Sequence, residues 1–443
     1  MSMVAKVALL LEKVLGAETE GLAQKHEVIR RKRKFTGQSL LRMLVVTLLK
    51  KPDATYADWA LTAAQMGIVV SATAVEKRFT QRLVDFLREA LNVALGQMLA
   101  AEAVSTKLLD RFTGVFIGDS SSIRLPDEMQ SEFPGCGGTE GSCAAALKLQ
   151  VRWDLKTGAL PQVLIEIGKA SDVKSPIAHQ EPLPGALEIF DLGYFSIERF
   201  RRLQAAKAFF ISRLQHGTAV FDRDGKVISL RTFLPANAVG GVVDVPVQLG
   251  QRDRLECRLI AVRVPEEIAN RRRQKARDKA RKRGSELSPE YSELLGWSLF
   301  VTNASDELLT WKEIVVLYRA RWQIELLFKH WKSHNQLACQ RSGATALESL
   351  AVLWAKLIGV MLQHWLLLTA VWPDERRSLF KAARALRDWI VTLLLALDNR
   401  QQLENTLTQL QAHLKCVAKI QSRRKNPSHF QLLSDPSLLN WDA

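Results

Sequence analysis

Near residue 110 the chain changes from helical periodicity to short apolar segments, and this change limits the folds available to it. Three such segments occupy residues 112–118, 187–190 and 208–212. A helical pattern at 196–206 separates the last two, and strands that alternate with a helix predict an α/β sheet layer. Asp119 and Asp191 directly follow the first two segments. We therefore expect each aspartate at the end of a strand, with Ser120–Ser122 in a turn.

Further β structure is expected on both sides of residue 200. Segments 145–154 and 160–168 flank the turn signal Lys156–Gly158 and predict a hairpin. Between residues 213 and about 265, alternating segments such as 254–264 predict a β-rich insert, and residues 297–303 predict a returning strand.

Both ends of the chain have helical periodicity, in residues 1–108 and after residue 335. Within the second region, Leu350–Trp372 is apolar enough to resemble a membrane span. Lys356, Gln363 and His364 interrupt it, and polar groups are costly in lipid. We expect a helix buried in a helical domain. The N-terminal apolar stretch contains Lys6 and Lys13 and has no cleavage pattern, so we expect no signal peptide.

The charge balance points to a polyanionic partner. Lys and Arg number 62 against 46 Asp and Glu, a formal net charge of +16. Basic runs at Arg30–Lys34 and Arg271–Arg283 predict contacts with nucleic-acid phosphates, although such runs also occur as solvated surfaces. Arg423–Lys425 is expected to be a basic loop. The five cysteines, including Cys143, lack zinc-site spacing and fit a reducing cytoplasm.

One helix-length stretch, 311–333, carries the most specific pattern. Tyr318, Arg321, Glu325 and Lys332 are three, four and seven residues apart, so they share one helical face. With Asp119 and Asp191, Glu325 would complete three carboxylates able to hold two Mg²⁺ or Mn²⁺ ions beside a phosphate. The alternative is a solvated helix in which Arg321 and Glu325 pair.

Other polar residues have simpler interpretations. His330 and His334 flank Lys332 without further ligands at metal spacing, so we expect them to be surface or phosphate contacts. Ser120–Ser122 lacks a histidine in a matching motif, so a nucleophilic role is not favoured.

The string YRARWQIELLFKHWKS, with its Tyr318-x2-Arg321-x3-Glu325-x6-Lys332 spacing, resembles the YREK motif of the insertion-sequence-four group of DDE transposases. The resemblance extends to GDSSSIRLP around Asp119, the D-x-G-Y that starts at Asp191, and WSLFVTN. It spans roughly residues 110 to 335.

This resemblance implies an α/β fold with an RNase H-like catalytic core, a β-strand insertion, and helical N- and C-terminal domains. The expected divisions are residues 1–108 (DNA binding), 109–212 and 297–335 (catalytic core), 213–296 (insertion) and 336–443 (possible dimerisation).

The resemblance also implies residue roles. Asp119, Asp191 and Glu325 would be the catalytic, metal-binding triad, and Tyr318, Arg321 and Lys332 would contact transposon-end DNA. Trp297 would stack near a flipped base, although a strand Trp is more often core; Trp322 is a competing candidate.

The implied function is that of a cytoplasmic, bacterial-type, nucleoid-associated transposase. It would bind inverted-repeat ends as a homodimer, cleave DNA with two metal ions, and transfer the 3′-hydroxyl ends to target DNA. Two rivals are a catalytically silent DNA-binding regulator derived from a transposase and a non-transposing RNase H-like nuclease. A membrane role is not expected.

Overall fold

The described residues form two compact units. The computed structural model describes residues 1–30, 34–137, 144–252, 254–339, 341, 343–372, 374, 376–420 and 427–439. Residues 31–33 of the first basic run, the loop Arg423–Lys425 and Cys143 lie outside this set. The helical unit comprises Met1–Val104, Ser120–Ala170 and Gln323–Ser422. The sheet unit comprises Ser105–Asp119, Ser171–Trp322 and Arg423–Ala443.

The sheet unit is built on strands in the order β1-β4-β5-β9-β8-β7-β6. Their bounds are β1 (Val115–Arg124, of which the first half lies in this unit), β4 (Leu187–Phe190), β5 (Phe209–Arg213), β6 (Val220–Phe221), β7 (Val242–Leu249), β8 (Leu255–Arg263) and β9 (Trp297–Thr302). β1, β4 and β5 are parallel, and the pairs from β5–β9 to β6–β7 are antiparallel. The mixed α/β class expected from the strand–helix alternation is confirmed.

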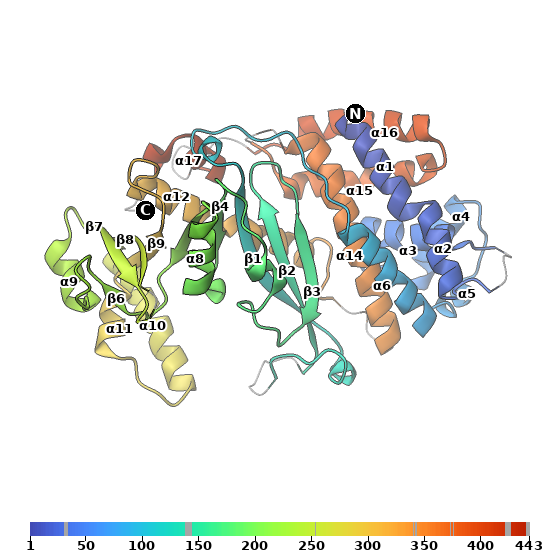
Figure 1. Ribbon diagram of the computed structural model, residues 1–443. Coiled ribbons are helices and arrows are strands. Elements are labelled where there is room, and N and C mark those ends of the chain that lie inside the picture. Colours follow the sequence, from blue (N-terminus) through green and yellow to red (C-terminus); the bar gives the residue numbers. More distant parts are fainter. Residues whose placement is uncertain are drawn as a thin grey trace. The chain divides into compact units, whose positions relative to one another are not determined.

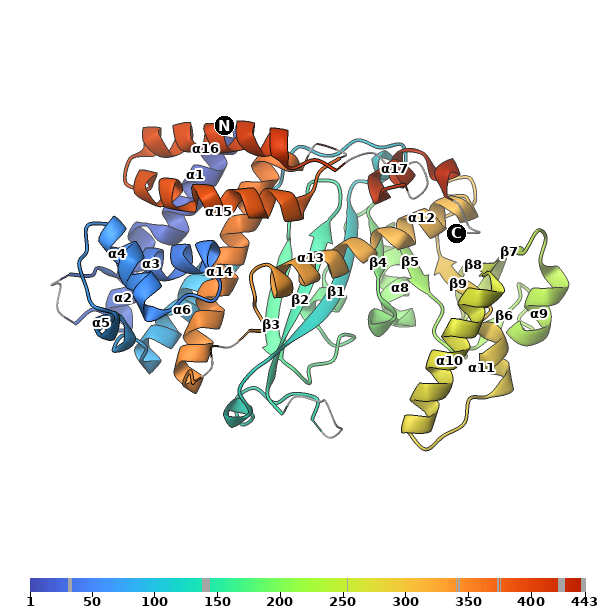
Figure 2. The ribbon, with the colours of Figure 1, turned by 180° about the vertical axis from the view of Figure 1, so that it is seen from behind.

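Helices cover both faces of the parallel strands. α8 (Ile197–Ala205) lies over one face (Figure 1), and α12 (Trp311–Ala320) crosses the other (Figure 2). The remaining helices of this unit are α7 (Pro176–His179), α9 (Leu230–Asn237), α10 (Glu266–Lys282), α11 (Pro289–Leu294), α17 (His429–Ser434) and the short η1 (Leu109–Arg111), η3 (Leu192–Tyr194) and η4 (Pro436–Leu438). A shared core of Phe200, Phe210, Leu259 and Val301 joins α8 to β5, β8 and β9.

The helical unit draws on both ends of the chain. Its helices are α1 (Met3–Leu15), α2 (Ala17–Lys25), α3 (Gly37–Lys50), α4 (Tyr56–Gln65), α5 (Ala72–Glu76), α6 (Gln81–Leu95), α13 (Trp322–Ser333, after its first residue), α14 (Ala346–Val371), α15 (Leu379–Ala396), α16 (Arg400–Val417) and the short η2 (Asp127–Met129). It also contains the second half of β1 and the hairpin of β2 (Ala146–Asp154) and β3 (Gln162–Ile167).

The central helix of this unit is α14, which packs against α3, α6 and α16. Among the described residues it is the one helix long and apolar enough to cross a membrane, and 94% of its most apolar window is buried inside the structure. The prediction of a buried helix across Leu350–Trp372 is therefore confirmed.

Most predicted elements form where the pattern placed them. The hairpin turn contains Gly158 at φ +71°, a conformation that favours glycine. The insert contains β6, β7 and β8, and Arg271–Arg283 lies almost wholly in α10.

The turn expected at Ser120–Ser122 is wrong, because β1 continues through these serines to Arg124. Ser122 and Arg124 are exposed while Ile123 between them is buried. That is the alternation of a strand with one solvated face, which a run of small polar residues conceals.

The predicted single helix over 311–333 is divided at Arg321. α12 ends at Ala320 and α13 begins at Trp322, while Arg321 itself keeps right-handed helical angles, φ −52° and ψ −33°. A Thr310–Glu313 capping box fixes the start of α12.

Candidate active site

The register of the two parallel strands brings Asp119 and Asp191 side by side. β1 and β4 pair from Val115↔Leu187 to Gly118↔Phe190, so the next position on each strand is an aspartate. Paired residues of parallel strands point to the same face and lie about 5 Å apart between backbones. The prediction that each aspartate follows the end of a strand is right for Asp191, which follows β4, and wrong for Asp119, which lies inside β1. The register nevertheless sets the two aspartates side by side in the sheet unit.

Packing beneath the aspartates fixes this register. A Cβ added to Gly118 would lie 2.0 Å from the Phe190 ring, so only glycine lets the ring cross β1 at this point. The guanidinium of Arg199 stacks 3.6 Å from the centre of the same ring and forms a buried ion pair with Glu188 of β4. α8 is thereby anchored directly to β4, the strand that Asp191 follows.

Arg321 supplies the positive charge between the two carboxylates. Its Nη1 donates a hydrogen bond to Asp119 Oδ2 at 3.1 Å, and its Nε lies 3.7 Å from Asp191 Oδ1. The side chains of Arg321 and Asp119 are 14% and 16% exposed, against 43% for Asp191. Arg321 and Asp119 are therefore largely shielded from water, whereas Asp191 is accessible to it.

Tyr318 lies one turn before Arg321 and is buried. Its ring packs against Phe300 of β9 at 5.2 Å between centroids, and the Arg321 guanidinium lies 5.8 Å from the Tyr318 ring. Burial raises the pKa of the Tyr318 hydroxyl to about 12, although the nearby Arg321 and Arg213 partly oppose the shift. The Tyr318 ring thus packs near the Arg321 guanidinium, and the Tyr318 hydroxyl stays protonated at neutral pH.

The other predicted residues of this face lie along α13. Glu325 and Lys332 are half-buried members of the helical unit, whereas Trp322 is 56% exposed. Among the described residues, no group of three or more His, Cys, Asp and Glu side chains is close enough to hold a metal ion. The structure thus brings together Asp119, Asp191 and Arg321. Two carboxylates that converge on one cation have the oxygen donors that Mg²⁺ or Mn²⁺ requires.

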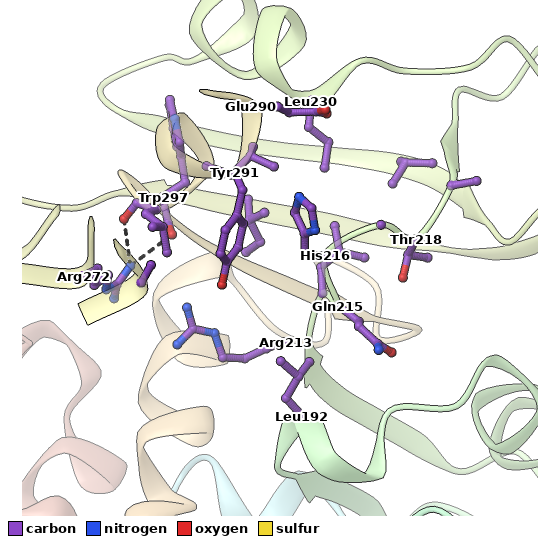
Figure 3. Close-up of a pocket in the computed structure, with 18 of the residues that line it drawn as sticks. Leu192, Arg213, Gln215, His216, Thr218, Leu230, Arg272, Glu290, Tyr291 and Trp297 are labelled. Carbon is purple, nitrogen blue, oxygen red and sulfur yellow. Dashed lines mark hydrogen bonds between the residues drawn. The ribbon is translucent and has the colours of Figure 1, made fainter. Parts of the chain in front are cut away.

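A cavity of about 720 Å³ opens beside Asp191 within the sheet unit (Figure 3). Its lining combines cations and aromatic rings: Arg213, Arg272, Lys275, Lys279, His216, Tyr291 and Trp297. His216 and Tyr291 lie 4.4 Å apart between ring centroids, and the Tyr291 hydroxyl points toward Arg213 (Figure 3). This combination suits a phosphate with an attached planar group.

Trp297 has a structural role in the wall of this cavity. Its side chain is 8% exposed and belongs to the core of the sheet unit. Arg272 of α10 donates hydrogen bonds to the Trp297 carbonyl at 3.0 Å and to Ser298 Oγ at 3.1 Å. Little of the Trp297 side chain is therefore available to a ligand in this cavity.

Sequence reasoning missed Arg213, His216 and Tyr291. Arg213 is the last residue of β5, the parallel strand next to β4, and it borders the same cavity as Asp191. The rule that singled out Asp191, a polar residue at the carboxyl end of a parallel strand, would also have found Arg213. No local pattern marks Tyr291, which the short helix α11 contributes.

His330 and His334 are not surface residues, so that prediction is wrong. Their rings stack at 4.7 Å between centroids, and Phe380 of α15 packs against both. Burial, with the positive charge of Arg387 nearby, lowers the pKa of His330 to about 3 and that of His334 to about 4. Both are neutral packing residues of the helical unit.

Comparison with known protein families identifies the class of enzyme. The model of the transposase DDE domain matches residues 110–358, more than half of the chain, so the chain belongs to the DDE transposase family. It is therefore an enzyme of DNA transposition, with DNA as its partner.

The similar curated proteins are transposases of insertion sequences. The chain is 27% identical to the transposase for insertion sequence element IS231F of Bacillus thuringiensis subsp. israelensis, over 88% of this chain and 87% of that protein. It is 26% identical to the IS231E transposase of B. thuringiensis subsp. finitimus over 94% and 91%. For the IS1151 transposase of Clostridium perfringens the identity is 26%, over 71% of each. The predicted membership of the insertion-sequence-four group is confirmed.

Proposed function

We propose that this transposase binds the inverted-repeat ends of its own element, hydrolyses phosphodiesters there, and joins the freed 3′-hydroxyls to target DNA by a cut-and-paste route. The observation that carries this proposal is the register that sets Asp119 beside Asp191 with Arg321 between them. We interpret the parallel strands with α8 and α12 as an RNase H-like core.

Asp119, Asp191 and Glu325 would hold two Mg²⁺ or Mn²⁺ ions. Bound there, such ions activate the attacking water or 3′-hydroxyl and stabilise the departing oxygen. The chain's own contribution is to hold the carboxylates at fixed positions, through the β1–β4 register and the Arg199–Glu188 anchor. Arg321 would orient the scissile phosphate, because its planar fork matches phosphate oxygens.

DNA contacts would extend outward from this site. We assign Lys332 to backbone phosphate, the exposed Trp322 to sugar or base, and buried Tyr318 to support of Arg321. Trp297 would meet an extruded base through the cavity beside Asp191.

α10 is a further candidate for backbone contact. Seven basic residues along it and just beyond it are exposed to solvent: Arg271, Lys275, Arg277, Lys279, Arg281, Lys282 and Arg283. Arg272 and Arg273 instead bond to main-chain carbonyls and hold the helix in place. A solvated basic face on an anchored helix suits tracking of a phosphate backbone.

Assembly and location follow from the same proposal. Two copies would bring together two transposon ends, with the helices after residue 340 as the contact surface. The enzyme would act in the cytoplasm, on nucleoid DNA.

The test is a Mg²⁺-dependent cleavage and strand-transfer assay on DNA that carries the element's own ends. Wild-type protein should cut at the ends and join them to a second DNA, whereas Asp119→Asn should bind the same DNA without cutting it. Binding without cleavage by the wild type would favour the silent regulator, and cleavage without end preference or joining would favour a general nuclease.

A further inference from the structure

The charges around Arg321 indicate how Asp119 and Asp191 are held together before a metal ion binds. Asp119 and Asp191 occupy adjacent register positions, so two negative charges face one another on the same side of the sheet. Like charges at paired positions destabilise a sheet unless a cation separates them. In this structure the cation is the guanidinium of Arg321, at 3.1 Å and 3.7 Å from the two carboxylates.

We propose that Arg321 is an exchangeable counter-ion, which holds Asp119 and Asp191 together until divalent metal takes its place. This inference rests on the proposed function, because it requires that these two aspartates bind metal. It concerns the state of the site before metal and DNA arrive, which the proposed function leaves open.

Competition follows from shared oxygens. Asp119 Oδ2 already accepts a hydrogen bond from Arg321 Nη1, and a metal ion on that oxygen would lie within a few ångströms of a like charge. Asp191, 43% exposed, is the more accessible of the two carboxylates. We therefore expect a metal ion to bind there first and displace Arg321 from Asp119.

The position of Arg321 in the chain suits such an exchange. It lies at the break between α12 and α13, so the regular helix hydrogen-bonding is interrupted at this residue. Tyr318 behind it is fixed by the Phe300 ring. A long side chain on a fixed base can leave the carboxylates without rearranging the sheet, and the released guanidinium is then available for phosphate.

The experiment measures Mn²⁺ binding to the full chain without DNA, by the electron paramagnetic resonance signal of free Mn²⁺. Arg321→Ala should bind Mn²⁺ with a dissociation constant roughly 3- to 10-fold lower than that of the wild type. Arg319→Ala removes the same charge from an exposed position two residues away and should leave the constant within about 2-fold.

Melting temperatures with and without Mn²⁺ show whether the Arg321→Ala variant is folded. Without metal, Arg321→Ala should melt a few degrees below the wild type, since its carboxylates repel, and saturating Mn²⁺ should remove most of that difference. Arg321→Lys keeps a single charge that cannot fork between two carboxylates, so it should give an intermediate affinity.

The results of these experiments distinguish the counter-ion exchange from the metal site on which it depends. If Mn²⁺ binds the wild type but not Asp119→Asn, and Arg321→Ala binds no more tightly than the wild type, the counter-ion exchange is overturned and the metal site stands. If no variant shows binding that depends on Asp119, the exchange and the proposed metal site are both overturned.

Discussion

The sheet unit and the helical unit both bury polar side chains, and they do so in opposite ways. In the sheet unit, Asp119 within β1, Asp191 just after β4, and Arg321 lie together beside partly open space. Inside the helical unit, Lys356 donates to the carbonyls of Gln336 and Cys339. Charged groups beside an opening therefore indicate a reactive site, whereas buried polar groups bonded to backbone carbonyls indicate packing.

Other polar residues within the apolar helix α14 also bond to neighbouring groups. His364 Nε2 lies 2.8 Å from the Gly158 carbonyl, and Asn335 donates to Gln363 at 2.9 Å. Burial lowers the pKa of Lys356 to about 8 and that of His364 to about 4. These residues connect α14 to the loops around it.

The largest effect should come from the carboxylates assigned to the site. Glu325→Gln should reduce end cleavage by about 10³-fold or more, because it removes a ligand charge. Glu313→Gln changes a carboxylate of the adjacent helix α12 that caps Thr310 and pairs with Arg111, so it should lower the melting temperature and retain cleavage. Cleavage rates measured beside melting curves check both. Equal cleavage by Glu325→Gln and wild type would contradict the assignment of Glu325 as a metal ligand.

The core of the helical unit should respond in stability alone. Trp365 of α14 is 1% exposed, and Trp365→Ala should cost about 3–5 kcal/mol of unfolding free energy. Leu395→Ala, at a residue of α15 that is 53% exposed, should cost less than about 1 kcal/mol. Urea unfolding measures both; a small effect of Trp365→Ala would mean that α14 is not the core.

Acid should weaken the helical unit through its buried histidines. The folded pKa of His330, His334 and His364 lies below the usual 6.5, so the unfolded chain binds more protons as pH falls. Their stability contribution is complete above pH 6.5 and declines toward pH 4. From pH 6.5 to 5, His364 alone should account for about 1–2 kcal/mol.

Melting curves across that range, on wild type and His364→Gln, measure this effect. The glutamine variant should show a shallower pH dependence. His216→Gln, at an exposed histidine of the sheet unit, should keep the wild-type slope. A wild-type slope in His364→Gln would contradict the assignment of the effect to His364.

The smallest effect should come from α10. Replacing Arg277, Arg281 and Lys282 with Gln should weaken DNA binding by roughly 3- to 10-fold and reduce the slope of log K against log salt by about 0.9 for each phosphate that the variant no longer neutralises. Arg272→Gln should instead lower stability, because Arg272 bonds to the backbone of β9. Binding titrations at several salt concentrations distinguish the two; an unchanged slope in the triple variant would remove α10 from the interface.

Local pattern predicted the parts of the fold that depend on local physics. Apolar runs with following aspartates placed β1, β4 and Asp191, and helical periodicity placed α14. The serines after Asp119 were misread because a solvated strand of small polar residues has the composition of a turn.

The site itself depended on contacts that no local pattern contains. Arg321 and Asp119 are 202 residues apart in sequence, and only the fold makes them partners. His330 and His334 seemed exposed because charged residues surround them in sequence, whereas Phe380, distant in the chain, covers both. Spacing along one helix could not foresee either arrangement.

Iron-directed backbone cleavage tests the proposal that Asp119, Asp191 and Glu325 hold metal together. With Fe²⁺ in place of Mg²⁺, ascorbate and peroxide generate hydroxyl radicals that cut the chain close to the bound ion. If the three carboxylates share the ion, fragments should end near residues 119, 191 and 325, and these fragments should disappear in Asp191→Asn. Cuts confined to other segments, or the same fragments from Asp191→Asn, would contradict it.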